Sequence, residues 1–413
     1  MGKQRKSPQP QPQQGDGDDG RQGISGAEFM LPISVAIAAF AIGRSGLFYS
    51  EAEGRVHFLV RLLFFGLLDS FARPAALSLI PIARVLARSL PGAVVPEDGG
   101  MLSKQESAQH DPSIVWPLAG TKLPDEWVSA AKERSKTTKQ PYFLNHQRGC
   151  VRVRQAALRL GAAAGTLMQV SAMCYLLDGK PLASIGLIWS TEDLQYGFFT
   201  GIACVAMLFV AEVSVGWIKV VGFFETAVEG EWLVLNLLWD VLFHVGVTLN
   251  EEVSMRGWLL VNTALATVAH LGASTTTAAA VAFGAQALLF AIAHLHSPGA
   301  TIVGLANLTL GGLAAALNVY MTGGLAFAMG WHFGWNITMG HLLGLSTSGI
   351  PMSSKLVSVV PHPKKAALHG GRFGPEQSPL AVPAYLLGVL LLFILYPAEE
   401  GDEGAWERLL KVE

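Results

Sequence analysis

The stretch VLFHVGVTLNEEVSMRGWLLV, residues 241–261, places two adjacent carboxylates and an arginine inside an otherwise apolar run. A segment needs about 20 apolar residues to cross the hydrocarbon core of a bilayer as a helix. Ionisable side chains at that depth are costly and usually functional. The stretch therefore predicts both a helix in a membrane and a polar site within it.

The composition of the whole chain supports a membrane protein. Of its 413 residues, 51% are hydrophobic and only 15% are charged, against roughly 25% charged residues in an average globular protein. So few charges cannot cover a soluble surface. The net charge of −2 gives no electrostatic reason to expect nucleic acid as a partner, and 3 cysteines cannot form a disulfide framework in a chain this long.

Apolar runs recur along the chain and predict an all-α, polytopic transmembrane helical bundle of about 8 to 9 helices with an intramembrane polar cavity. The clearest spans are 155–177, 197–221, 232–250 running on toward 265, 276–295, 300–322, 325–345 and 381–397. A further span is predicted near 29–48. The apolar segment 56–92 is interrupted by basic residues, which suit a headgroup region.

The segments between these runs suggest a domain organisation: a disordered polar tail (1–28), N-terminal apolar and interfacial helices (29–100), a basic loop (101–150), the domain with the polar clusters (151–350), a second basic loop (351–380) and a last transmembrane helix with its tail (381–413). Both basic loops are predicted to be cytosolic. The protein is expected to be an integral, multi-pass membrane protein, in the endoplasmic reticulum, a plastid or the plasma membrane.

The first polar cluster contains Glu251, Glu252 and Arg256. On a helix Glu252 and Arg256 are one turn apart, with the acid on the N-terminal side, which is the favourable order for an ion pair. Glu251 is rotated by roughly 100° from Glu252 and is left without a helical partner. The pattern predicts a Glu252–Arg256 structural clamp and a reactive Glu251, with a helix-end ion pair devoid of chemistry as the alternative.

The second cluster contains Phe290 and His294, one turn apart on the same face of an apolar run. Pro298 and Gly299 follow closely and break the helix, which places His294 near its C-terminal turn. A lone histidine in this position is often only a core or interface residue. His296 faces away from His294 and is expected at the interface.

The third cluster contains His332 and Asn336, which project from one helix face. Gly330 and Gly334 form a small-x3-small edge that permits close approach of another helix. Other polar or aromatic residues of this segment are expected at the membrane interface: Trp331, Trp335 and His341. The preceding helix, 300–322, is rich in small residues and is expected to pack tightly beside a cavity that hydrates all three clusters.

The three clusters together resemble a known family. Glu251-Glu252-x3-Arg256, Phe290-x3-His294 and His332-x3-Asn336 match, in order, the motifs of the CAAX protease and bacteriocin-processing family of intramembrane proteases, which includes the type II CAAX prenyl endopeptidases. The resemblance covers about 150–350. Met255 is a departure, because members often carry an aromatic residue before the arginine.

The resemblance implies an intramembrane endopeptidase in which Glu251 and His294 activate a water, and His332 and Asn336 stabilise the oxyanion. Glu252 and Arg256 would support the site. If the enzyme uses a divalent metal such as zinc, Glu251, His294 and His332 would be its ligands; the same groups can also act without one. The implied substrate is a protein or peptide at the bilayer, in the CAAX case one that loses a C-terminal tripeptide after a prenylated cysteine.

Other functions compete with this interpretation. Glu251 and His294 could form the proton relay of a proton-coupled transporter, or the chain could be a catalytically inactive membrane scaffold of the same family. The sequence contains no HExxH motif of a site-2-type zinc protease. Residues Gly43–Gly46 fit the GxSG pattern of rhomboid proteases, but such a match is common in a chain with 45 glycines.

Overall fold

The computed structural model describes residues 49–50, 55–56, 60–63, 65, 149–226, 232–350, 352, 354–397 and 404–411. The predictions for the polar tail, for nearly all of the N-terminal apolar segment and for the first basic loop lie outside these residues. The GxSG pattern at Gly43–Gly46 lies outside them as well.

The described chain is helical, which confirms the predicted all-α fold. Its helices are α5 (Gly149–Ala172), α6 (Thr191–Ser214), α7 (Leu233–Glu251), α8 (Leu260–Leu271), α9 (Thr275–Ala293), α10 (Ile302–Thr322), α11 (Ala326–Ile337), α12 (Ala381–Leu395) and α13 (Ala405–Leu410). In this part of the chain 5 helical stretches are long and apolar enough to cross a membrane, so the protein is a multi-pass membrane protein.

The glutamate motif lies in the middle of the longest helical stretch. Helices α7 and α8 belong to one run of 39 residues, Leu233–Leu271, and the segment between them, Glu252–Leu259, is a π-helix. Such widened turns are rare and are often found at functional sites, because the extra residue changes the direction in which side chains project. Here the widened turn begins at the second glutamate.

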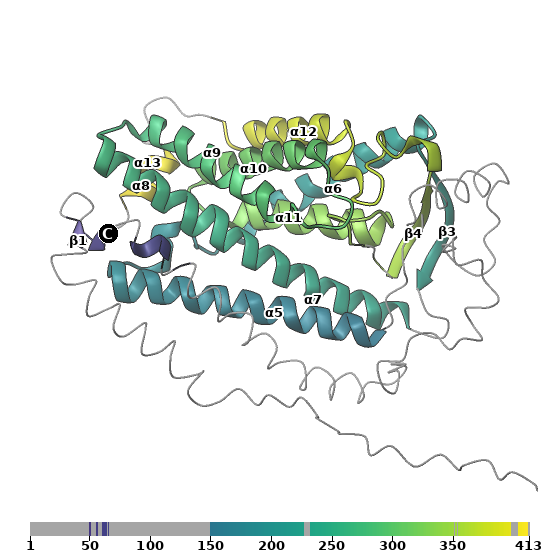
Figure 1. Ribbon diagram of the computed structural model, residues 1–413, viewed down its shortest axis with the longest axis horizontal. Helices are drawn as coiled ribbons and strands as arrows, with labels where there is room; N and C mark the ends of the chain where they lie inside the picture. The colour runs from purple at the N-terminus through teal and green to yellow at the C-terminus, as the bar shows by residue number, and fades with distance from the viewer. Residues whose placement is uncertain are drawn as a thin grey trace, which may run out of the picture.

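Figure 1 shows α5 and α7 side by side along one side of the molecule, with α9, α10 and α12 on the other and α11 between them. Helix α11 also packs along α6. A Cβ atom on Gly330 or Gly334 would collide with the backbone of α6 at Leu194 and Phe198. The predicted glycine edge is therefore confirmed as the close contact that fixes α11.

Helix α11 is shorter than the predicted span 325–345 and continues as a π-helical turn, Thr338–Leu342. Trp331 and Trp335 are buried, and the Trp335 ring stacks on Tyr385 with the centroids 5.0 Å apart. Their predicted place in an interfacial belt is wrong, because α11 lies between α6, α7 and α10.

A two-stranded ribbon accompanies the helices. Strand β3 (Ile218–Thr226) pairs antiparallel with β4 (Ser354–Pro361), with Ile218 opposite Pro361 and a bulge between Val220 and Gly222. The predicted span 197–221 thus ends earlier as a helix, and the predicted basic loop 351–380 contains a strand. Figure 1 shows the ribbon at one end of the bundle.

The start of α5 lies at the end of the bundle that carries this ribbon. Met352, two residues before the start of β4, packs with Ala156 of α5 and with Phe243 and Val247 of α7. The start of α5 and the start of β4 therefore lie at the same end of the bundle. That this end faces the cytosol remains a prediction from charge.

Candidate active site

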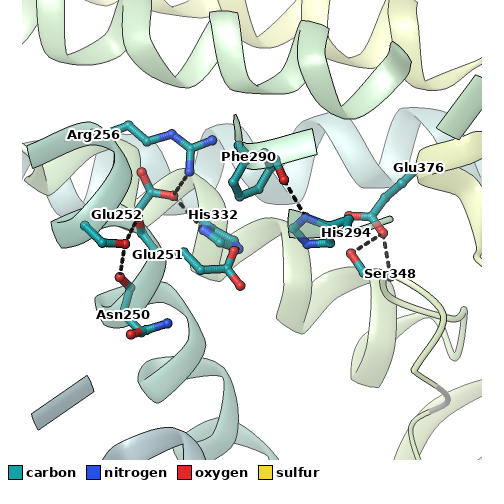
Figure 2. A network of polar contacts seen from close by, with 10 residues as sticks. Asn250, Glu251, Glu252, Arg256, Phe290, His294, His332, Ser348 and Glu376 are labelled. Carbon is teal, nitrogen blue, oxygen red and sulfur yellow. Dashed lines mark hydrogen bonds and ion pairs between the residues drawn. The ribbon is translucent and has the colours of Figure 1, made fainter. Parts of the chain in front are cut away.

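A cavity of about 430 Å³ lies among α5, α7, α9, α10 and α11. It is lined by all six residues that the sequence singled out: Glu251, Glu252, Arg256, His294, His332 and Asn336. The predicted polar cavity within the bundle is confirmed. Figure 2 shows two sets of polar residues, with Glu251, Glu252, Arg256 and His332 in one set and His294 with Glu376 and Ser348 in the other.

Glu252 is the buried centre of the first set. Its Oε1 lies 3.2 Å from Nη1 of Arg256 and 2.7 Å from Nδ1 of His332. The predicted ion pair with Arg256 is confirmed. The contact with His332 was not foreseen: a carboxylate accepts only, so the Nδ1–H of His332 donates to it. Glu252 therefore sets the orientation of the His332 ring as well as holding the arginine.

Glu251 lies differently from its neighbour. Its side chain is 21% exposed, whereas that of Glu252 is 1% exposed. Its Oε2 lies 3.8 Å from Nε2 of His332, which is beyond the range of a direct hydrogen bond. The predicted division of roles fits this arrangement, because Glu251 opens on the cavity while Glu252 is held in the wall.

His294 caps the C-terminus of α9. Its Nδ1 lies 2.9 Å from the backbone oxygen of Phe290, and a carbonyl oxygen can only accept, so Nδ1 carries the proton. The lone pair of the neutral ring is consequently on Nε2. Phe290 connects this histidine to the first motif, since its ring lies 4.8 Å from the His294 ring and 4.1 Å from Cζ of Arg256.

Asn336 lies one turn after His332 on α11 and is nearly buried. Its side chain lines the cavity, and no residue of the described chain forms a hydrogen bond with its amide group. A side-chain amide in this position can donate to a substrate oxygen.

Glu376 is a site residue that the sequence patterns did not predict. Ser348 donates to its Oε2 twice, from the backbone N–H at 2.5 Å and from the hydroxyl at 2.9 Å. Burial raises the pKa of Glu376, although the Ser348 donors and the nearby His294 oppose this shift. The sequence offered no signal for it, because Glu376 belongs to a loop that only the fold brings against the cavity.

His341 corrects another prediction. It is buried rather than interfacial: its Nδ1 lies 2.9 Å from the backbone oxygen of Ser354 and 3.5 Å from Asp240, and its Nε2 lies 3.2 Å from Nε2 of His244. The predicted interfacial position of His341 is wrong because β4 covers this face of the segment and because the turn that carries His341 is π-helical. His296, by contrast, is exposed and lies along the cavity wall.

The zinc alternative requires Glu251, His294 and His332 to converge on one point. Among the described residues no group of three or more histidine, cysteine, aspartate or glutamate side chains is placed to hold a metal ion. In this arrangement the three side chains do not converge as a three-ligand site requires, and Figure 2 shows His294 apart from Glu251 and His332, beside Ser348 and Glu376.

Comparison with protein families gives a match over part of the chain. Residues 232–338 match the family model of the Rce1-like type II CAAX prenyl endopeptidases. No curated protein and no solved structure matches the chain. The matched segment includes the glutamate motif, His294, His332 and Asn336, whereas Ser348 and Glu376 lie beyond its end.

This match agrees with the resemblance seen in the three motifs, and the coarse conclusion is a multi-pass membrane protein with a segment similar to membrane proteases. Residues 232–338 of this chain are thus similar to the Rce1-like type II CAAX prenyl endopeptidases.

Proposed function

We propose that this protein is an intramembrane endopeptidase that hydrolyses a peptide bond by attack of an activated water. The observation that carries the proposal is the convergence of Glu251, His294, His332 and Asn336 on one cavity. Their roles separate by environment: Glu251 and the Nε2 atom of His294 are available as bases, while His332 is fixed in orientation by Glu252.

The reaction follows general base catalysis. Glu251 accepts the proton that leaves the water as its oxygen bonds to the scissile carbonyl carbon, and Nε2 of His294 accepts a hydrogen bond that orients this water. The negative charge that forms on the carbonyl oxygen is stabilised by Nε2–H of His332 and by the amide of Asn336. When the C–N bond breaks, the stored proton passes to the leaving amine, and the site returns to its starting state.

Glu252 supports this chemistry through His332. For His332 to donate from Nε2 while Nδ1 donates to Glu252, the ring must carry a positive charge. The buried carboxylate at 2.7 Å stabilises that charge, as an orienting acid does for the histidine of a catalytic triad. Arg256 in turn holds the Glu252 carboxylate in place.

The finer form of the proposal concerns the substrate. The family match supports a protein with a prenylated C-terminal cysteine, from which the enzyme releases the C-terminal tripeptide. A prenyl chain partitions into the bilayer and would bring the scissile bond to the depth of the cavity.

The test is cleavage by the purified protein of a prenylated reporter peptide and of unmodified membrane-protein tails. We expect cleavage of the prenylated peptide by the wild type, and its loss in Glu251→Gln and His294→Ala. Glu192→Gln, at an exposed carboxylate on α6, is the matched control and should retain activity. Cleavage that survives both site substitutions would refute the assignment, and proton-coupled uptake into liposomes without any cleavage would favour the transporter.

A further inference from the structure

The cavity contains a cationic side chain that the proposed reaction does not use. Arg159 lines it from α5, and its Cζ lies 5.5 Å from the centroid of the Phe243 ring. No carboxylate of the described residues forms an ion pair with Arg159. An arginine in a cavity wall that pairs with no carboxylate of the described residues is suited to bind a carboxylate of a ligand, since its planar fork matches that group.

A second unused polar group lies beside it. The rings of Phe243 and His244 are 5.1 Å apart, and His244 lines the same cavity. His244 is 1% exposed, and its Nδ1 is buried without a hydrogen-bond partner. Burying such an atom without a partner is unfavourable, so Nδ1 of His244 has an unused capacity for one hydrogen bond.

The proton positions follow from the neighbouring contacts. His341 donates its Nδ1–H to the backbone oxygen of Ser354, so the Nε2 atom of a neutral His341 is an acceptor. His244 must then donate from Nε2 across the 3.2 Å contact. This leaves the Nδ1 atom of His244 with a lone pair, which can accept a backbone N–H of a bound peptide.

The separation of His244 and Glu251 along α7 matches the length of a short peptide. His244 and Glu251 are seven residues apart on a regular α-helix, which is close to two turns, so both project from the same face. The rise between them is about 10 Å. An extended tripeptide spans about 10 Å as well.

We propose that Arg159 and His244 form the subsite for the C-terminus of the substrate. Arg159 binds the terminal carboxylate, and Nδ1 of His244 accepts the N–H of the last peptide bond. The two turns of α7 between His244 and Glu251 then set the cut three residues from the C-terminus. This inference rests on the proposed peptidase function and adds to it the feature by which the enzyme selects chain ends.

The test compares prenylated peptides that share one sequence and end in a free acid, in an amide, or in a free acid one residue further on. We expect the wild type to cleave the free tripeptide end about 10 to 100 times more efficiently than the amide, as loss of a charged hydrogen bond predicts. Arg159→Gln should cleave acid and amide with equal efficiency, with the change mainly in KM. Lys219→Gln removes an equal charge from exposed β3 and should keep the preference.

The role of His244 is tested with a second peptide that ends in a free acid and has its last peptide nitrogen methylated. Methylation removes the N–H that Nδ1 of His244 would accept. The wild type should discriminate against this peptide relative to the unmethylated one, and His244→Ala should not. The subsite would be refuted by a wild type indifferent to acid and amide, or by an Arg159→Gln variant that loses activity equally on both.

Binding to the Glu251→Gln protein separates this inference from the proposed reaction. Fluorescence anisotropy with labelled acid and amide peptides should show tighter binding of the acid, and the added Arg159→Gln substitution should abolish the difference. If the wild type cleaves nothing but this preference is present, the reaction is wrong and the subsite stands. If cleavage occurs without the preference, the subsite is wrong and the reaction stands.

Discussion

Glu252 Oε1 accepts a hydrogen bond from His332 Nδ1 at 2.7 Å and thereby joins the π-helical segment after α7 to α11. The same oxygen holds Arg256 at 3.2 Å. The second glutamate of the motif is therefore shared between a structural ion pair and the histidine assigned to the oxyanion. A substitution of Glu252 affects both roles at once. The two roles can still be told apart by measuring catalytic activity and the free energy of unfolding separately.

Glu252→Gln should damage both activity and stability. It removes the anion that favours a charged His332, so we expect kcat to fall by about 100-fold or more. It also leaves the Arg256 charge buried without its counter-ion, which costs about 3 to 5 kcal/mol in the free energy of unfolding. Peptide cleavage and thermal unfolding in detergent measure the two effects.

Glu251→Gln is the comparison for that variant. Because Glu251 is partly exposed, its substitution should lower kcat without a comparable loss of stability. Equal destabilisation by both substitutions would contradict the division of roles between the two glutamates.

Asn336→Ala should reduce kcat by about 100- to 1,000-fold, because it removes one donor to the oxyanion. KM should change little, since this hydrogen bond strengthens only as charge develops in the transition state. Steady-state kinetics on the prenylated reporter peptide distinguish the two parameters. A raised KM with an unchanged kcat would mean that Asn336 binds substrate instead.

Gly334→Ala should destabilise the protein by about 1 to 3 kcal/mol, because the new methyl group collides with the backbone of α6 at Phe198. Gly284→Ala on α9 is the matched control, since a Cβ atom there meets nothing within 4 Å. In that helix interior alanine is neutral or more stable than glycine by up to about 1 kcal/mol. The midpoint temperature of thermal unfolding should therefore fall in Gly334→Ala and stay the same or rise in Gly284→Ala. Equal shifts of this temperature in the two variants would contradict tight α6–α11 packing.

Glu376→Gln should become more stable relative to wild type as the pH rises. Burial raises the pKa of Glu376, so the folded protein holds this proton more tightly than the unfolded chain does. The wild type then loses stability as the pH rises through the raised pKa, whereas glutamine does not ionise. Unfolding temperatures of both proteins between about pH 4 and pH 9 test this, with the exposed Glu192→Gln as control. If the difference in unfolding temperature between the two proteins were the same at every pH in that range, Glu376 would not titrate as expected.

Removal of metal should leave peptide cleavage intact. The described histidines and carboxylates form no ligand cluster, and Glu251 with His294 can activate water without a Lewis acid. The measurement is activity after exhaustive chelation and after dialysis into metal-free buffer. Loss of activity that zinc alone restores would require Glu251, His294 and His332 to rearrange into a three-ligand site.

The sequence alone determined the features that depend on local order. Apolar run lengths predict the spans, and the helical period predicts the Glu252–Arg256 pair, the shared face of Phe290 and His294, and that of His332 and Asn336. These interactions lie within one or two turns of a helix, so residue spacing suffices. The small-x3-small edge of α11 was also readable, because glycines one turn apart permit close approach whichever helix is the partner.

Only the tertiary structure decided which groups meet across the chain. The bond between Glu252 and His332, the approach of Glu376 to the cavity and the pairing of His341 with His244 join segments far apart in the sequence. The ribbon of β3 and β4 and the π-helical turns changed which faces are covered. Spacing fixes what lies on one helix face, but the partner of that face is set by packing between helices, which no local pattern records.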